Sequence, residues 1–492
     1  MKLLKLATCI TAASLLVACG SDSKDTSTTA APFSQDNAQK VINTNADIAY
    51  AAYSDSVTTA EALKTALDDF ETDRSAENLE AAKEAWLTSR EPYGQTEVYR
   101  FRPTPIEVIN GEDGPEGDLN AWPLGEALID YVKTGDDFDT DQIGVTAHSV
   151  EVEDGGTDLP ASITVNNASN IADAAGNNII QNTDVIINAA LLANTASATD
   201  EHDVIAGYHA IEFLLWGQDL NSDNSVTQAS DRTDAVNTGA TGGQRPLTDF
   251  TTDTHADRRH AFLAIAVQKL IDDLTEVRDE WAPEIADNYR AEFTTLDSEA
   301  DAKTKLEEIL TGMGTLSEGE LAGERMKIAL NNNSQEDEHS CFSDNTHRDI
   351  WLNAEGVSNS YYGQYQGYDA DLDPETVNIS VAGAVDGYGI YDYMRDAGLE
   401  NLAEDVKTAF DDTENKYTAI DTQARAGVPF DVLIEEGNTV NNTYVGDTIE
   451  ALNRQANAIQ VIADELGLGD VVDDEASACD TSSAGSVDGE EC

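Results

Sequence analysis

The stretch that decides the fold is RRHAFLAIAVQKLIDDLTEVRDEW, which spans residues 258–281. Large apolar side chains recur in it at spacings of 4, 3, 4, 3 and 4 residues, which is typical of a helix that buries one face in a bundle. Pro283 follows shortly, as expected just past the end of a helix. The apolar positions are Leu263, Val267, Leu270, Leu274, Val277 and Trp281.

The same period recurs along most of the chain. Strand-like alternation is scarce, with short candidates at 163–165 and 377–381. Two stretches, 135–183 and 218–256, are rich in Asp, Gly, Asn and Thr and predict irregular loop insertions. Many helices joined by loops, without the pattern of a parallel sheet, predict an all-α helical-bundle fold. The further predicted helices are 37–64, 76–88, 124–132, 184–193, 203–216, 300–309, 399–420 and 448–466.

Composition limits the function. A chain of 492 residues corresponds to two or three domains, and its 94 Asp and Glu outnumber 28 Lys and Arg, for a net charge of −66. Such an acidic chain repels phosphate backbones, so we expect no nucleic-acid partner. It also repels an anionic membrane surface, so any membrane attachment must be covalent or inserted. A salty habitat and a cation-binding role both explain the excess charge, and composition leaves both open.

The first residues predict a lipid anchor. Lys2 and Lys5 precede an apolar run that is too short to span a bilayer comfortably, so residues 1–18 are predicted to be a signal peptide. The closing LVAC resembles the lipobox of bacterial lipoproteins, which makes Cys19 the expected lipidation site. An ordinary secretory signal is the alternative. We therefore expect a bacterial cell-envelope protein held at the membrane by its N-terminal lipid, and the following Gly-Ser favours the outer membrane, facing the periplasm.

Both ends of the mature chain predict segments without a core. Residues 19–36 are rich in Ser, Thr and Asp and predict a flexible tether behind the lipidated cysteine. Residues 470–492 predict an acidic disordered tail. Cys341, Cys479 and Cys492 remain after processing, and their spacing leaves any disulfide pairing open.

The motif GYHAIEFLLWGQD, residues 207–219, carries the first candidate chemistry. His209 and Glu212 are three residues apart, so on a helix they project from one face and can converge on a cation. Gly207 is a poor helix former and predicts close packing beside the site. The apolar neighbours predict burial, and a buried imidazole and carboxylate need polar partners or a metal ion. A metal or catalytic site and a satisfied His–Glu pair in the core both fit this motif.

The motif REPYGQTE holds the second candidate. Arg90, Tyr93 and Glu97 recur at spacings of three and four residues and can share a helical stripe. Pro92 fits the first turn of a helix, so we expect a helix that begins near Glu91. The interleaved aromatic side chains favour a carboxylate in a half-buried setting, and a surface ion pair is the alternative.

The third candidate is EDEHSCFSDNTHRD, residues 336–349, which combines two histidines, a cysteine and five acids. Imidazole and carboxylate suit first-row metal ions, so a second metal site is one interpretation. His339 and His347 are eight residues apart, however, which is poor spacing for joint ligation from one regular helix. The alternative is a capping segment in which Ser343 or Asp344 caps the next helix.

Together these motifs resemble the imelysin-like family, also described as insulin-cleaving membrane peptidases. GYHAIEFLLWGQD carries the family's G-x-H-x-x-E signature, and REPYGQTEVYRF and LAGERMKIALNNNSQEDEHSCFSDNTHRDI resemble the branch called iron-regulated protein A. The resemblance covers residues 40–465. It implies two helical-bundle domains, which we expect at 37–256, including the insertion at 135–183, and at 257–469.

The resemblance also implies a metal site, iron-linked expression and a bacterial envelope location. Carried over onto this sequence, the family's motifs give His209, Glu212 and Glu97 as the metal ligands. The supporting residues implied in the same way are Gly207, Arg90, Tyr93, Ser343 and Asp344.

Three functions follow as hypotheses. The first is a protein that binds a metal ion and assists iron acquisition beside the iron-uptake machinery; iron is favoured because the donor set is rich in oxygen, ahead of zinc, manganese or calcium. The runner-up is a metal-dependent peptidase, which would need an unusual site because the motif is neither H-E-x-x-H nor H-x-x-E-H. The third is an envelope module that binds a partner protein or polysaccharide, with His209 purely structural.

Overall fold

The computed structural model describes residues 33–122, 124–132, 149–151, 162–164, 178–183, 185–192, 204–219, 242–333, 335, 337–372, 377–435 and 442–472. The predicted signal peptide, Cys19 and nearly all of the predicted tether lie outside these residues. So do most of the insertion predicted at 135–183 and nearly all of the tail predicted at 470–492.

The described chain is mostly helical, as the hydrophobic period predicts, and it has an all-α fold. Each of its three two-stranded sheets is a short antiparallel pair: β1 with β2, β3 with β4 and β5 with β6. Among the described residues, no helix is both long enough and apolar enough to cross a membrane. The elements are α1 (Gln35–Thr72), α2 (Ala76–Gly94), η1 (Glu97–Tyr99), β1 (Val108–Ile109), β2 (Glu112–Asp113), α3 (Glu116–Leu119), α4 (Glu126–Ile129), β3 (Ser149–Glu151), β4 (Ser162–Thr164), η2 (Ala189–Leu192), α5 (Gly207–Trp216), α6 (Thr248–Thr251), α7 (Ala256–Trp281), α8 (Tyr289–Phe293), α9 (Glu299–Thr315), η6 (Leu316–Ile328), α10 (Ala329–Asn332), α11 (Thr346–Tyr362), β5 (Gln364–Tyr365), β6 (Val385–Asp386), α12 (Ile390–Asp396), α13 (Glu400–Arg425), α14 (Phe430–Ile434) and α15 (Asn442–Leu466).

Helix α7 confirms the prediction made from its apolar spacing. It ends at Trp281, two residues before Pro283, and all six apolar positions of the seam are buried. Two other long helices begin where a serine side chain accepts a backbone N–H: Ser34 caps α1 and Ser75 caps α2. Local sequence therefore sets these helix starts, and burial of one face stabilises the helices.

Two predicted helices are much shorter than expected. The stretch predicted at 124–132 is helical only over α4, which ends where Asp130 turns to buried arginine partners. In the stretch predicted at 184–193, the described residues 185–192 form only the single 3₁₀ turn η2. The short strand predicted at 163–165 is observed as β4, whereas 377–381 forms an isolated bridge at Ile379 in place of a strand.

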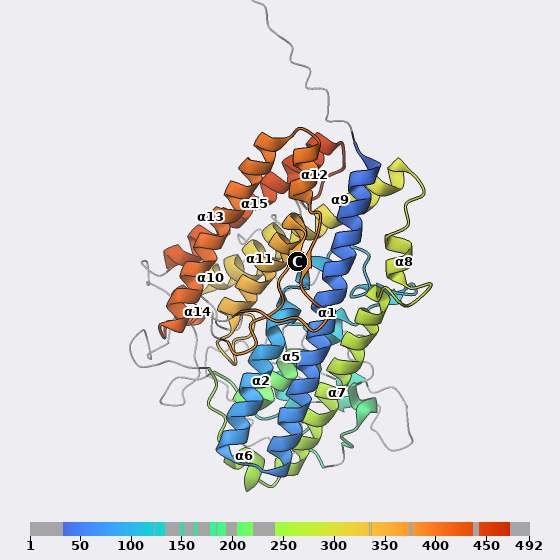
Figure 1. The fold of residues 1–492 in the computed structure, drawn as a ribbon. Coiled ribbons are helices and arrows are strands. Elements are labelled where there is room, and N and C mark those ends of the chain that lie inside the picture. The colour runs from blue at the N-terminus through green and yellow to red at the C-terminus, as the bar shows by residue number, and fades with distance from the viewer. Residues whose placement is uncertain are drawn as a thin grey trace, which may run out of the picture. The chain divides into compact units, whose positions relative to one another are not determined.

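Two sets of helices meet around α11. In the first, α1 packs against α2 and α7, and α5 packs against α2 and α7; in the second, α13 packs against α15, and α15 packs against η6 (Figure 1). Helix α11 contacts α2 on one side and α13 and η6 on the other. The candidate site lies among α2, α5, η6 and the start of α11. The division into domains at 37–256 and 257–469 stays a prediction.

Helix η6 is a π-helix of 13 residues between α9 and α10. Its hydrogen bonds join residues five apart, so side chains four and five positions apart lie on one face. Glu320, Glu324 and Arg325 follow this spacing, and all three line the same cavity. The wider turn of the π-helix therefore concentrates charged side chains at one place.

Candidate metal centre

Helix α5 carries the G-x-H-x-x-E motif into the interior, where His209 and Glu212 are completely buried. Nδ1 of His209 lies 2.9 Å from Oε2 of Glu212. The other oxygen of Glu212 accepts hydrogen bonds from the backbone N (2.9 Å) and Oγ (2.7 Å) of Ser343. Both carboxylate oxygens of Glu212 are therefore engaged, and Nε2 of His209 points away from them.

A second histidine faces the first. Nε2 of His339 lies 3.2 Å from Nε2 of His209, and the two rings are perpendicular. On its other side, Nδ1 of His339 lies 2.9 Å from Oδ2 of Asp349, a buried residue near the start of α11. The site therefore consists of two histidine–carboxylate pairs that meet through their Nε2 atoms.

Both imidazoles are neutral at neutral pH. Burial, reinforced by the positive charge of Arg90, lowers the pKa of His209 well below its ordinary value. Burial lowers the pKa of His339 in the same way, reinforced by Arg325 and by the other histidine. A neutral imidazole has one donor and one acceptor nitrogen, so the hydrogen bond at Nδ1 determines what Nε2 can do.

The two carboxyl groups differ in charge. Burial raises the pKa of Glu212 to about 8 despite its hydrogen bonds from Ser343. Burial alone would also raise the pKa of Asp349, but Arg90 and His339 hold it well below its usual range. Asp349 is therefore ionised and accepts the Nδ1–H of its histidine, which leaves a lone pair on the Nε2 of that ring.

The facing Nε2 atoms can be satisfied in two ways. In the first, a neutral Glu212 donates to Nδ1 of His209, whose Nε2–H then donates to Nε2 of His339. In the second, both rings carry their proton at Nδ1, and two lone pairs face each other. The second arrangement is stable only with a cation between the nitrogens.

Arg90 and Tyr93 support this arrangement from α2. Arg90 donates to Oδ1 of Asp349 from Nη2 (2.9 Å) and Nε (3.3 Å) and to Oδ1 of Asn120 from Nη1 (2.5 Å). Its guanidinium carbon lies 4.8 Å from the ring centroid of Tyr208 and 5.5 Å from that of Tyr93. The arginine therefore fixes the carboxylate that orients the second histidine.

Glu97 reaches the histidines through an amide. Nδ2 of Asn120 donates to Oε1 of Glu97 at 3.2 Å and lies 3.4 Å from Nε2 of His339. The other oxygen of Glu97 accepts from Arg325 at 3.3 Å and from Arg100 at 3.4 Å. The structure thus brings the three predicted ligands into one cluster, with Asn120 between Glu97 and the histidine pair.

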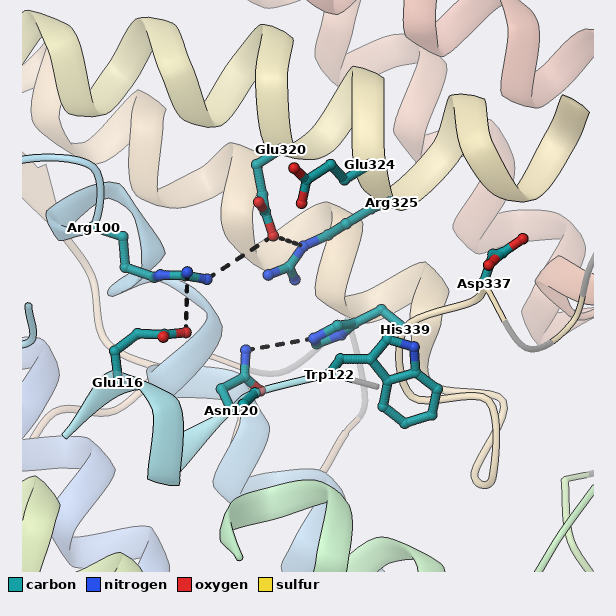
Figure 2. Close-up of a pocket in the computed structure, with 10 residues that line it drawn as sticks. Arg100, Glu116, Asn120, Trp122, Glu320, Glu324, Arg325, Asp337 and His339 are labelled. Atoms are coloured by element: carbon teal, nitrogen blue, oxygen red, sulfur yellow. Dashed lines mark hydrogen bonds and ion pairs between the residues drawn. The ribbon is translucent and has the colours of Figure 1, made fainter. Parts of the chain in front are cut away.

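A cavity of about 210 Å³ opens beside His339. Figure 2 shows Arg325 and Glu320 from η6 on one side of it and Asn120 on the other. Nε of Arg325 donates to Oε1 of Glu320 at 2.7 Å, across one turn of the π-helix. The histidine pair is therefore reached from a polar chamber.

Acidic groups prevail in this cavity. Burial raises the pKa of Glu116 to about 7 despite the nearby Arg100. Burial and the neighbouring Glu320 raise the pKa of Glu324 to about 7. Glu320 itself has a pKa lowered to about 2, because Arg325 and Arg100 outweigh its burial. Raised carboxyl pKa values indicate that a further positive charge in the cavity would be stabilised.

Within the described residues, no three His, Cys, Asp or Glu side chains converge as a complete set of metal ligands. The chain itself offers two nitrogen ligands, the Nε2 atoms of His209 and His339. Other ligands would have to come from solvent or from a small molecule in the cavity.

Comparison with known proteins identifies the family. A family model described as Imelysin, under the name Peptidase_M75, matches residues 49–459. The chain belongs to the imelysin family. It matches no curated protein.

A solved structure shares the imelysin-like fold. It is the crystal structure of a protein from Parabacteroides distasonis that is described as an iron-regulated protein A precursor. The alignment covers 89% of this chain and 97% of that chain, with a TM-score of 0.55 and 16% sequence identity. The similarity confirms the fold expected from the motifs.

Three local predictions about this imelysin-family chain are wrong. Pro92 lies in the last turn of α2, which runs unbroken from Ala76, and no helix begins near Glu91. Arg90 and Glu97 do not form a surface ion pair, because both are buried and bound to other partners.

The predicted helix cap is also wrong. Helix α11 has Asn345 as its N-cap, without a capping side-chain hydrogen bond. Ser343 binds Glu212 in place of the helix end. The backbone oxygen of Asp344 accepts a hydrogen bond from Nδ1 of His347. Asp344, which was predicted to support the site, and His347 therefore lie outside the pair formed by His209 and His339.

Gly207 packs as predicted. It has φ +79°, and a Cβ there would lie 2.5 Å from the backbone oxygen of Leu119. The residue thus lets the start of α5 approach the segment that carries Asn120. Its positive φ also explains why the helix predicted from residue 203 begins only at Gly207.

The sequence motifs did not identify the whole imelysin-family site. His339 stood out in the cluster at 336–349, but nothing in its spacing pairs it with His209. Asp349 belongs to the same cluster, but its spacing does not distinguish it from the other acids there. Asn120 and Arg325 carry no sequence signal, because each is a single polar residue that only the tertiary fold brings to the site.

Proposed function

We propose that this imelysin-family protein binds a metal ion between Nε2 of His209 and Nε2 of His339 and assists the acquisition of iron at the bacterial cell envelope. The observation that carries the proposal is the 3.2 Å separation of these nitrogens, each belonging to a ring whose Nδ1 is held by a carboxylate. Histidine metal ligands are commonly oriented in this way.

The separation fits a bound metal. Metal–imidazole bonds of about 2.0–2.1 Å would place an ion on both nitrogens with an N–metal–N angle of roughly 100°, between octahedral and tetrahedral geometry. The acidic cavity supplies negative potential on the open side of the histidine pair. The nitrogen separation and the acidic cavity both favour a metal cation, rather than a proton alone, between the two Nε2 atoms.

The proposal gives the predicted residues different roles. His209 is a ligand as predicted, and His339 joins it. Glu212 and Asp349 orient the two rings through Nδ1, and Ser343 holds Glu212 in place. Direct ligation by Glu212 and Glu97, which the family resemblance implies, stays a prediction.

Iron is the preferred ion. Two imidazoles with oxygen ligands from the cavity suit first-row ions, including iron, with zinc and manganese as competitors and calcium the weakest candidate. The structurally similar protein from Parabacteroides distasonis is described as iron-regulated. A lipidated Cys19 would keep the site at the membrane surface, where cooperation with iron-uptake machinery is possible.

The test compares metal binding in three variants. We expect His209→Ala and His339→Ala each to lose nearly all iron after loading and desalting, because one imidazole and solvent cannot replace the pair. His255→Ala, at a half-buried histidine just before α7, is the matched control and should retain wild-type iron. Equal iron content in the wild type and both site variants, all folded by circular dichroism, would contradict the proposal.

The peptidase alternative has a separate test. A metallopeptidase needs a carboxylate that can take a proton from a metal-bound water, as in H-E-x-x-H enzymes. Both oxygens of Glu212 are already engaged, so the geometry favours binding over hydrolysis. Chelator-sensitive cleavage of an unfolded protein, lost in His209→Ala, would establish the peptidase instead.

A further inference from the structure

Arg325, which lines the cavity beside the histidine pair, carries a buried donor without a partner among the described residues. Arg325 is 4% exposed, and its Nε and Nη2 donate to Glu320 and Glu97. Its remaining nitrogen, Nη1, is buried and has no hydrogen-bond partner among the described residues. Leaving a buried donor without a hydrogen bond costs about 1–3 kcal/mol of folding free energy, and more when the group is charged.

Arg325 and one histidine of the pair, His339, lie at one cavity. Figure 2 shows the guanidinium group between Glu320 and the imidazole. A ligand in the cavity can therefore meet the arginine and a metal ion at the same time.

The size and charge of the cavity restrict that ligand. Its volume of about 210 Å³ is several times the roughly 30 Å³ that a water molecule occupies in the liquid, and it is below the 300 Å³ at which typical organic-ligand pockets begin. Glu116, Glu320 and Glu324 line the cavity and repel a multiply charged anion. Arg100 already meets four carboxylates, so it offers little to a ligand.

We propose that the cavity binds a small carboxylate-type oxyanion through Nη1 of Arg325, and that this anion completes the coordination of the metal ion held by His209 and His339. One oxygen accepts from the arginine and another binds the ion. The inference rests on the proposed metal site, because the bound cation offsets the surrounding carboxylates. Bicarbonate and the carboxylate of a small chelator share this chemistry.

The test measures iron affinity by competition with a chromogenic chelator in carbonate-free chloride buffer. Bicarbonate, glycolate or phosphate is then added in separate arms. We expect bicarbonate or glycolate, both of which carry a single negative charge, to raise the affinity of the wild type about tenfold, within the usual range of coupling between two ligands, and phosphate to have little effect. A response to bicarbonate alone identifies an inorganic anion, and a response to glycolate alone identifies a chelator carboxylate.

Two variants assign the effect to the arginine. Arg325→Lys keeps the positive charge but loses Nη1, so the ratio of its iron affinities with and without the anion should fall from about ten to about one, whatever its affinity in chloride buffer. Arg245→Lys, at a buried arginine outside the cavity, is the control and should keep the wild-type ratio. The ¹³C signal of labelled bicarbonate, measured with a diamagnetic ion in place of iron, should shift in the wild type and not in Arg325→Lys.

The outcomes separate the two proposals. Iron binding that is equal with and without every anion would overturn the oxyanion site and leave the histidine site intact, with water completing the coordination. Full enhancement in Arg325→Lys would likewise overturn the role of Nη1. Absence of iron binding in all arms would overturn the proposed function itself.

Discussion

Two buried polar clusters in this protein are equally well sealed from solvent and differ in what they leave unsatisfied. In the first, Asp130 accepts from Nη1 of Arg245 at 2.6 Å and from Nε and Nη2 of Arg259 at 2.7 and 3.1 Å. In the second, His209 and His339 present nitrogen to nitrogen at 3.2 Å beside a polar cavity.

The contrast separates a structural cluster from a functional one. Opposite charges face each other around Asp130, so both oxygens of its carboxylate are paired without any ligand, and the ion pair with Arg259 ties the end of α4 to α7. Two like groups face each other at the histidine pair, and the cluster is complete only with a proton or a metal ion. Burial alone therefore does not identify a site. Two like groups that face each other, and that need a proton or a metal ion between them, do.

The largest expected effect breaks the structural cluster. Asp130→Asn leaves two buried guanidinium groups without a carboxylate, so the free energy of unfolding should fall by about 3–5 kcal/mol. Urea denaturation measures it. Iron bound per folded chain should stay at the wild-type level, and a loss of iron binding from the folded fraction would show that the two clusters are not independent.

The next effect lies in the cavity and depends on pH. Glu116 has a folded pKa of about 7, above its unfolded value of 4.5, so the folded state holds the extra proton between these pH values. Stability from this group is therefore full below pH 4.5 and is lost as the pH rises through 7.

Replacing the Glu116 carboxyl group tests the predicted direction of this pH dependence. In the metal-free wild type, unfolding free energy should fall by about 2 kcal/mol between pH 5 and pH 8 through this group, and Glu116→Gln should abolish that part of the fall. Glu77→Gln, at an exposed glutamate on α2, is the control. An unchanged pH dependence of the unfolding free energy in Glu116→Gln would show that burial in the cavity does not raise the pKa of this carboxyl group.

The smallest expected effect is on the support of the first histidine. Ser343→Ala removes the Oγ donor to Glu212 and leaves the backbone donor, so iron affinity should fall about tenfold, at the low end for groups that orient metal ligands. Competition with a chelator measures it. Ser56→Ala, at a buried serine bonded within α1, should leave the affinity unchanged; equal affinities in both variants would contradict the role of the Ser343 hydroxyl in holding Glu212.

Sequence predicted the parts of the fold that follow an apolar period. Helices α7, α13 and α15 bury apolar seams, and their predicted bounds lie within six residues of the observed ones. Helix α11 was missed because its buried face carries Asp349, Asn353 and other polar residues, which erase the apolar period. The π-helix was missed because its side chains do not follow the period of 3.6 residues.

The candidate site was predicted in the same uneven way. His209 and Glu212 stand out because both lie on one short helix, and Arg90 and Glu97 because of their spacing and the family resemblance. Pairing His209 with His339 spans 130 residues, and local spacing holds no information about such a contact. The sequence therefore identified the site's local motifs, and only the tertiary fold showed which atoms face each other.

The central claim is that one metal ion bridges the two facing imidazoles, and X-ray absorption spectroscopy of the iron-loaded mature protein tests it directly. The account predicts scattering from two imidazole rings in the wild type and from only one in any residual iron bound to His209→Gln or His339→Gln. A wild-type spectrum with one imidazole or none, at full iron occupancy, would contradict it.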